Sequence, residues 1–152
     1  MKIIEIKATE RIDECWDLLL EHREELATHK DIMVLEPDRV FYKGLEDENR
    51  LLSLALVDND EKIVGYSVTI LTHALHYSSL PIAANDLIFV HKDHRGGRWG
   101  LALIKETERL ARVRLPGQHV LMTFHGKQNT SFSQIMPRLG YGVQDIIFSK
   151  VI

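Results

Sequence analysis

The sequence has few residues that could staple the chain or anchor it in a membrane. Cys15 is its only cysteine, so a disulfide within the chain is excluded, and no cysteine and histidine quartet exists for a structural zinc site. No run of about 18 apolar residues occurs, and Met1 to Lys7 alternates charged with apolar residues where a signal peptide would be apolar. We therefore expect a cytoplasmic protein with no membrane partner.

With 152 residues, the chain is long enough to bury one core without such staples. A domain of this length buries roughly two-thirds of the surface that its unfolded chain exposes. No repeat, low-complexity stretch or linker interrupts the sequence. We therefore expect residues 1–152 to form a single domain.

Charge is distributed unevenly, although the net charge is only −3. Residues 1–61 contain 17 acidic residues against 8 Lys or Arg, net −9, whereas residues 62–152 contain 11 Lys or Arg against 5 acidic residues, net +6. An anionic ligand would favour the second half and a cationic ligand the first, although solvated surfaces explain most single clusters. We expect no nucleic-acid partner, because the chain is net acidic and no aromatic residues lie among Arg109, Arg112 and Arg114.

Apolar periodicity predicts an alternation of strands and helices. Apolar side chains recur at helical spacing between Arg11 and Ala27, whereas Lys62 to Leu71 is rich in the β-branched residues typical of a strand. Strands are expected at residues 2–7, 51–57, 62–71, 81–90, 119–124 and 142–152, and helices at 11–27, 39–45, 98–115 and 132–139. This order predicts an α/β fold of the α+β type, with a mixed central sheet of about six strands and four helices on its faces.

The segment from Arg95 to Gly100 reads R-G-G-R-W-G and lies between a predicted strand and a predicted amphipathic helix. Its three glycines allow the backbone to approach a ligand closely. The first N–H groups of a helix have no partner within the helix and, with the positive end of the helix dipole, form an anion site. Arg95 and Arg98 add charged donors that suit phosphate oxygens. The turn therefore indicates a pyrophosphate site.

Two common phosphate-binding patterns do not fit this turn. A Walker A loop ends in G-K-[ST], but Gly100 is followed by leucine and alanine. The dinucleotide fingerprint G-x-G-x-x-G would need a glycine in place of Arg95 and an acidic residue about 20 positions further on. No Asp or Glu lies between Glu108 and Asp145.

The pattern that remains is [QR]-x-x-G-x-[GA], the coenzyme A signature of the GNAT superfamily of N-acetyltransferases, and the sequence resembles that superfamily. Leu87 to His94 (L-I-F-V-H-K-D-H) looks like its fourth strand and the lead-in to the turn, and Lys127 to Tyr141 looks like its closing helix. The N-terminal part agrees in element order and length only. R-G-G-R-x-G and the L-H-Y at Leu75 to Tyr77 look most like small acetyltransferases encoded in phage genomes, which would act in a bacterial or phage-infected cytoplasm.

This resemblance implies a GNAT fold, with a sheet that splays between its fourth and fifth strands, and acetyl-coenzyme A or coenzyme A as the co-substrate. Arg98 replaces the inner glycine of the signature, so its side chain must point away from the pyrophosphate or fold over it, and we favour the second arrangement as a clamp. The coenzyme-binding positions carried over are Phe89, Val90, His91, Arg95, Gly96, Gly97, Arg98, Trp99, Gly100 and Asn129.

The resemblance also implies that an amine attacks the thioester directly while the pantetheine arm lies along the fourth strand. A backbone N–H at Val90 or His91 would polarise the carbonyl oxygen. Asp86 lies four residues before Val90 and, by the two-residue period of a strand, on the same face, which makes it a candidate general base. His76 could relay a proton from the preceding loop, although a surface or packed histidine is the more ordinary interpretation.

Met136 stands where the superfamily commonly has the tyrosine that protonates the leaving thiolate, so water is the acid that remains. The first two helices and their loop would form the acceptor site. Their carboxylates Glu24, Glu25, Asp31 and Glu36 suit a cationic amine, of either a small molecule or a protein.

The sequence leaves two questions open, catalytic turnover and the oligomeric state. A GNAT-fold module that binds coenzyme A without turnover is the rival to an N-acetyltransferase. The oligomeric state has no signature in the sequence, and a homodimer is one alternative. We expect no metal, because the histidine pairs with i,i+3 spacing fall in predicted strands or loops.

Overall fold

The computed structural model describes residues 1–117, 119–127 and 130–152. Strands and helices alternate in nearly the expected order, although a helix begins earlier than expected near the N-terminus and the hairpin strands are longer. The elements are β1 (Lys2–Ile6), α1 (Ala8–Arg11), η1 (Ile12–Cys15), α2 (Trp16–Leu26), α3 (Arg39–Asp47), β2 (Leu51–Val57), β3 (Ile63–Ala74), β4 (Tyr77–Val90), η2 (Lys92–His94), α4 (Trp99–Arg114), β5 (Leu121–Phe124), α5 (Ser131–Ile135) and η3 (Met136–Leu139).

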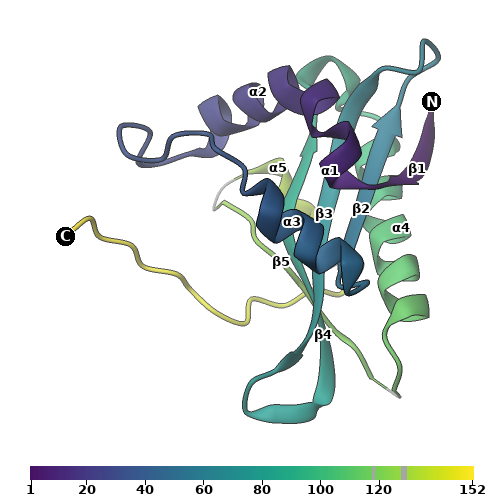
Figure 1. Ribbon diagram of the computed structural model, residues 1–152, viewed down its shortest axis with the longest axis vertical. Coiled ribbons are helices and arrows are strands. Elements are labelled where there is room, and N and C mark those ends of the chain that lie inside the picture. The colour runs from purple at the N-terminus through teal and green to yellow at the C-terminus, as the bar shows by residue number, and fades with distance from the viewer. Residues whose placement is uncertain (118, 128–129) are drawn as a thin grey trace.

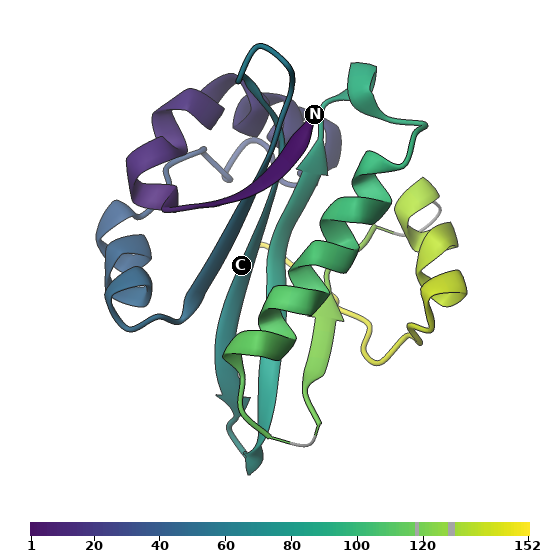
Figure 2. The same ribbon diagram turned by 90° about the vertical axis from the view of Figure 1, so that its right-hand side faces the viewer.

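The five strands form one mixed sheet in the order β1-β2-β3-β4-β5. The first four strands pair antiparallel, and β4 pairs parallel with β5. Helices α1, α2 and α3 lie on one face of the sheet and α4 lies on the other, as the two views show (Figures 1 and 2). The predicted α+β fold with a mixed sheet and helices on both faces is confirmed.

Both faces of the sheet are packed because its central strands are apolar on both sides. All seven residues of β2 are buried. Leu103 and Ala111 of α4 pack against Leu52 and Leu54 on one face. On the other face, Leu18 of α2 belongs to a cluster that rests on the opposite side of β2 and β3. Strands buried on both faces read as continuous apolar runs, which is how β2 appears in the sequence.

A buried polar cluster lies at the centre of the sheet. The side-chain nitrogen of Asn85 lies 2.9 Å from both Ser67 Oγ and Thr69 Oγ1. Thr107 of α4 extends the cluster, since its Oγ1 lies 2.9 Å from Ser67 Oγ. The cluster therefore connects the middle of β4 to β3 and α4. The Asn85 amide nitrogen is therefore satisfied, whereas its Oδ1 has no hydrogen-bond partner among the described residues.

The prediction of a final strand at Gly142 to Ile152 is wrong. This segment forms no strand in the structure, so the sheet of the described residues has five strands and not six. The segment extends away from the sheet after η3 (Figure 1), and its Ser149 Oγ lies 3.2 Å from His29 Nε2 in the loop after α2. Its β-branched and apolar residues give it strand propensity, but propensity is expressed only where a partner strand is available.

Candidate active site

Strand β4 continues beyond the end of its neighbour β5. The two strands pair only from Ile82 to Asn85 on β4, and β5 ends at Phe124. The rest of β4, from Asp86 to Val90, therefore has an edge with no strand partner among the described residues. This confirms the expected splay between the fourth and fifth strands.

The backbone N–H and C=O of Val90 face this open edge. His91 N donates to Val64 O at 2.8 Å, so His91 and Val64 form a hydrogen-bonded pair of the ladder. The preceding pair, Val90 with Gly65, is then a pair without hydrogen bonds between its two residues. In an antiparallel ladder, the backbone N–H and C=O of a non-hydrogen-bonded pair face away from the partner strand. The expectation that His91 N–H could polarise a carbonyl oxygen is therefore wrong, because β3 occupies that donor. Val90 N–H has no strand partner in the part of the chain that the structure describes, and it remains available.

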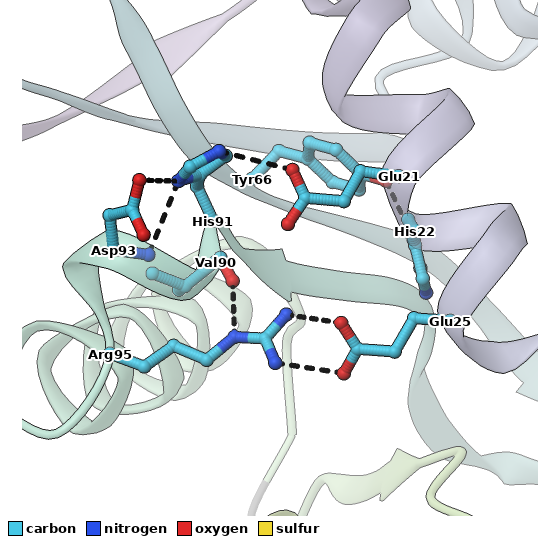
Figure 3. Close-up of polar contacts among 8 residues, drawn as sticks. All are labelled: Glu21, His22, Glu25, Tyr66, Val90, His91, Asp93 and Arg95. Atoms are coloured by element: carbon cyan, nitrogen blue, oxygen red, sulfur yellow. Dashed lines mark hydrogen bonds and ion pairs between the residues drawn. The ribbon is translucent and has the colours of Figure 1, made fainter.

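The Arg95 side chain covers part of this edge (Figure 3). Its Nε donates to Val90 O at 2.6 Å, and its two terminal nitrogens donate to the two carboxylate oxygens of Glu25 at 2.8 and 2.7 Å. The guanidinium also lies 4.8 Å from the centre of the Phe89 ring. Arg95, expected to bind phosphate, instead connects β4 to α2. Its donated hydrogen bonds hold the pKa of the Glu25 carboxyl below its usual value.

The glycine turn leads directly to the start of α4. Gly96 has φ +82°, a left-handed conformation that favours glycine. A Cβ added to Gly97 or Gly100 would meet no atom within 4 Å. No side chain caps α4, and the Arg98 guanidinium lies over the Trp99 ring, 4.9 Å from its centre. Open space, uncapped amides and a nearby cation together fit an anionic group such as a pyrophosphate.

One expected coenzyme contact, Asn129, lies outside the described residues. His91, expected to contribute through its backbone, instead uses its ring. Its Nε2 lies 3.1 Å from a carboxylate oxygen of Glu21, and its Nδ1 accepts from Asp93 N at 3.3 Å (Figure 3). These contacts connect the segment that precedes the turn to α2.

A β-bulge changes the direction of the side chains on β4. Val68 pairs with Leu87 and Thr69 pairs with Asn85, so Asp86 has no partner residue on β3. Beyond the bulge, Leu87 packs on the side of α2, whereas Val90 packs on the side of α4. A bulge inserts one residue and shifts the two-residue period by one.

The bulge overturns the argument that placed Asp86 and Val90 on one face. Asp86 is exposed, and its charge helps to raise the pKa of Tyr42, which burial has already raised. The same charge favours protonation of His22. Asp86 therefore lies on the side of α2 and α3.

His22 of α2 is a candidate that the sequence interpretation missed. Its Nδ1 lies 2.6 Å from Tyr66 Oη, and its ring stacks on Phe89 with a centroid distance of 4.6 Å and an interplanar angle of 14°. Burial lowers the pKa of His22 from its ordinary value, which favours the neutral ring. The sequence does carry a signal for it. His22 continues the helical spacing of the apolar residues Cys15, Leu18 and Leu19, which places it on the buried face of the helix.

The role predicted for His76 is wrong. Residues 75 and 76 form the turn between β3 and β4, and His76 is exposed there, at the far tip of the hairpin (Figure 1). Ten residues of strand separate it from Asp86, which corresponds to roughly 30 Å. The predicted loop is instead part of a long hairpin that points away from the open edge of β4.

Met136, at the position of the expected tyrosine, is buried in η3. Tyr141 donates from its hydroxyl to a carboxylate oxygen of Glu108 at 2.5 Å and packs edge-on against Phe124. Burial and this bond to a carboxylate both raise the pKa of the Tyr141 phenol. The phenol therefore stays protonated and bound to Glu108.

Within the described ranges, no three His, Cys, Asp or Glu side chains gather into a group that could hold a metal ion. None of the helices described is long and apolar enough to cross a membrane.

No protein-family model matches the sequence, and no curated protein matches it significantly. Solved structures nevertheless share its fold over the whole chain. A mutant of a Bacillus halodurans protein matches with a TM-score of 0.74 at 16% identity, covering 100% of this chain and 99% of that one. The ribosomal-protein-alanine N-acetyltransferase of Brucella melitensis matches with a TM-score of 0.64 at 19% identity, covering 100% and 99%.

An aminoglycoside acetyltransferase from an uncultured soil metagenomic sample, in complex with sisomicin, matches with a TM-score of 0.70 at 15% identity, covering 99% of this chain and 95% of that one. At such identities the likeness establishes the fold. The chain therefore has a GNAT-like fold, shared with acetyltransferases of small molecules and of proteins.

Proposed function

We propose that this protein transfers the acetyl group of acetyl-coenzyme A to a primary amine. One observation carries the proposal: the open edge of β4 at Val90 leads, within ten residues, into a glycine turn at the uncapped start of α4. An extended arm with a polyanionic end would meet both features in that order. The shared fold with acetyltransferases supports the same conclusion.

The chain's own groups have distinct tasks in this proposal. The amides at the start of α4, with Arg98 beside them, bind the pyrophosphate. Val90 N–H donates to the thioester carbonyl oxygen as negative charge develops there, a role worth about 3 kcal/mol in other enzymes. Arg95 Nε already donates to Val90 O, so the pantetheine arm competes with Arg95 for this carbonyl.

His22 is the proposed general base. When its Nδ1 donates to Tyr66 Oη, its Nε2 keeps a lone pair, and this nitrogen has no hydrogen bond within the described ranges. The neutral ring accepts the proton of the ammonium, and the exposed carboxylate of Asp86 attracts the cation to the same side of the sheet. Because Met136 supplies no proton, water protonates the leaving thiolate.

Two measurements test this function. Acetyl-coenzyme A at 100 times its dissociation constant should stabilise the fold by about 2.7 kcal/mol in a thermal melt. Thiol release should then follow in the presence of a suitable amine. Absence of a melting shift would overturn the proposal.

The alternative is a module that binds coenzyme A without turnover. It is favoured by Met136 and by the contact of Arg95 with Val90. A melting shift with no thiol release from any of a broad panel of amines would support it. The cytoplasmic location and the relation to phage enzymes stay predictions.

A further inference from the structure

A cavity of about 220 Å³ lies between the sheet and the helices α1, α2 and α3. Its walls are mainly apolar and include Cys15, Leu19, Val68 and Leu87. Arg11 and Glu36 also line it. For comparison of size, a cavity of about 150 Å³ lined by leucine, isoleucine and phenylalanine binds benzene. This one therefore has room for a ring and a short chain.

One wall of the cavity carries a buried polar group that lacks a partner. Ser53, in the middle of β2, is 3% exposed, and its Oγ has no hydrogen-bond partner among the described residues. Ser53 also lines the cavity. Burying a hydroxyl without a partner is unfavourable, and such groups are rare in native proteins. A ligand group in the cavity that bonds to Ser53 would remove this defect.

One residue of the cavity wall, Tyr66, contacts the proposed base. The contact joins its hydroxyl to His22. Leu87, on the same wall, follows Asp86 directly at the bulge. An amine whose body occupied the cavity would therefore emerge near His22, next to the open edge of β4.

We infer that the acceptor is a small primary amine with an apolar body of about one ring and a short chain. This inference rests on the proposed function. A hydrogen-bonding group on that body meets Ser53 Oγ. A polyhydroxylated amine such as sisomicin is excluded from the cavity, because its many polar groups would lose their bonds to water without replacement.

Binding of 2-phenylethylamine without coenzyme provides the test. This amine should raise the melting temperature by several degrees and sisomicin should not. Val68→Phe fills the cavity and should abolish the shift, whereas Val113→Phe, on an exposed site of α4, should preserve it. Tyramine, whose hydroxyl can reach Ser53, should bind more tightly than 2-phenylethylamine, and Ser53→Ala should remove that difference.

A second readout avoids variants that fail to fold. Cys15 lines the cavity and is the only thiol, so bound 2-phenylethylamine should slow its labelling by a small thiol reagent. No melting shift and no protection of Cys15 would overturn the inference. If sisomicin were acetylated while 2-phenylethylamine did not bind, acetyl transfer would stand and this acceptor class would fall. If coenzyme itself did not bind, the proposed function would fall instead.

A different observation concerns the outer edge of β5. Among the described residues this strand pairs only with β4, and a groove of about 700 Å³ runs beside it, between α4 and the chain after η3. Leu121 and Met122 of β5 line the groove, together with Tyr141 and Val143. An unpaired strand edge beside an apolar groove is a site at which another strand can pair.

The C-terminal segment has the composition of such a strand. Its apolar side chains are exposed where it extends from the domain (Figure 1). They are Val143, Ile146, Ile147, Phe148, Val151 and Ile152, with exposed fractions from 52% to 109%. Contiguous apolar exposure of this kind marks an interaction surface.

We propose that residues 143–152 pair with β5 of a second copy of the chain, and that the exchange is reciprocal. Both complementary surfaces belong to the same chain, so a two-fold dimer satisfies both at once. The segment begins at the rim of its own groove and then points away from its own β5 (Figure 1). Its side-chain contact with the rest of the domain is the exposed pair of Ser149 Oγ and His29 Nε2, and pairing with the edge of another molecule would replace it.

Light scattering should show a dimer, and deletion of residues 143–152 should give a monomer. For the pairing itself, chains with Thr123→Cys should form disulfides with chains carrying Ser149→Cys when the two are mixed. Asp60→Cys, in the turn between β2 and β3, should not replace Thr123→Cys. A full-length monomer at all concentrations would overturn the exchange. So would an internal disulfide in a monomer that carries both Thr123→Cys and Ser149→Cys.

Discussion

Arg95 and Glu25 form a two-point ion pair, with nitrogen to oxygen distances of 2.8 and 2.7 Å, that joins the turn before α4 to α2. The same guanidinium donates to Val90 O. A ligand that needs the guanidinium of Arg95 must therefore displace Glu25, and one that needs the carbonyl of Val90 competes with Arg95 for it.

Glu25→Gln should therefore tighten binding of coenzyme A. Removing the carboxylate frees Arg95 for the phosphates, and about 1 kcal/mol corresponds to roughly fivefold in affinity. The fold should lose at most about 1 kcal/mol, because the pair is partly exposed and screened by solvent. Calorimetric titration measures the affinity. Glu24→Gln, whose carboxylate pairs with Lys30, is the control and should change nothing. Weaker binding by Glu25→Gln would show that the ion pair positions α2 for the ligand.

His22→Gln should lower kcat by about 10²- to 10⁴-fold and leave the affinity for coenzyme A unchanged. The rate of the unchanged enzyme should rise with pH through the pKa of His22, which burial holds below 6.5. A pH profile of kcat measures this limb, which should disappear in the variant. Full activity of His22→Gln would leave Asp86 as the remaining base.

The same histidine should affect stability. Its pKa is lower in the folded chain than the ordinary 6.5, so below that pH the unfolded chain binds more protons. Stability should therefore fall as the pH decreases from about 6.5 through the folded pKa of His22, because protons then favour the unfolded chain. Denaturant titrations of the original protein and of His22→Gln should show a shallower fall for the variant. Parallel curves would mean that other groups cause the dependence.

Arg98→Gly should weaken coenzyme A binding several-fold, because the variant loses a cation beside the phosphates. The guanidinium lies over the Trp99 ring and needs to move only within the turn to reach them. Titration with coenzyme A and with adenosine separates the effects, since adenosine lacks the pyrophosphate and should not distinguish the two proteins. Arg138→Ala is a control on η3. Equal or tighter binding by Arg98→Gly would refute the clamp.

Two glycines of the turn should respond in opposite ways to alanine. Gly96 has φ +82°, so Gly96→Ala should cost about 1 kcal/mol of stability. Gly100→Ala meets no atom within 4 Å in the first turn of α4, and it should preserve or raise the melting temperature. Its methyl group should nevertheless obstruct the phosphates and weaken coenzyme A binding. Unchanged affinity of Gly100→Ala would place the phosphates elsewhere.

Local patterns predicted local structure well. The glycine turn from Arg95 to Gly100 and the apolar periodicity of α4 are determined by neighbours in the sequence, and both were recognised. The splay followed from the resemblance. The partner of Arg95 was not predictable, because Glu25 lies 70 residues away and only the folded chain brings the two together.

The remaining errors have specific physical causes. The bulge at Asp86 depends on the register between β3 and β4, which leaves no mark in a two-residue period. His76 was placed in a loop because the strand was expected to begin at Pro81, whereas it begins at Tyr77. His22 is polar but completes an apolar face of α2. The segment after Gly142 has strand composition but no partner in its own sheet.

The Asn85 cluster connects the two ends of the proposed ligand path. Asn85 immediately precedes the bulge that orients Asp86, and through Ser67 it contacts Thr107, which lies about two turns into α4. The helix start that would receive the phosphates and the strand edge that would receive the acetyl group therefore share one anchor. A small rotation of α4 would disturb both together, so the spacing between them depends on three side chains that no ligand need touch.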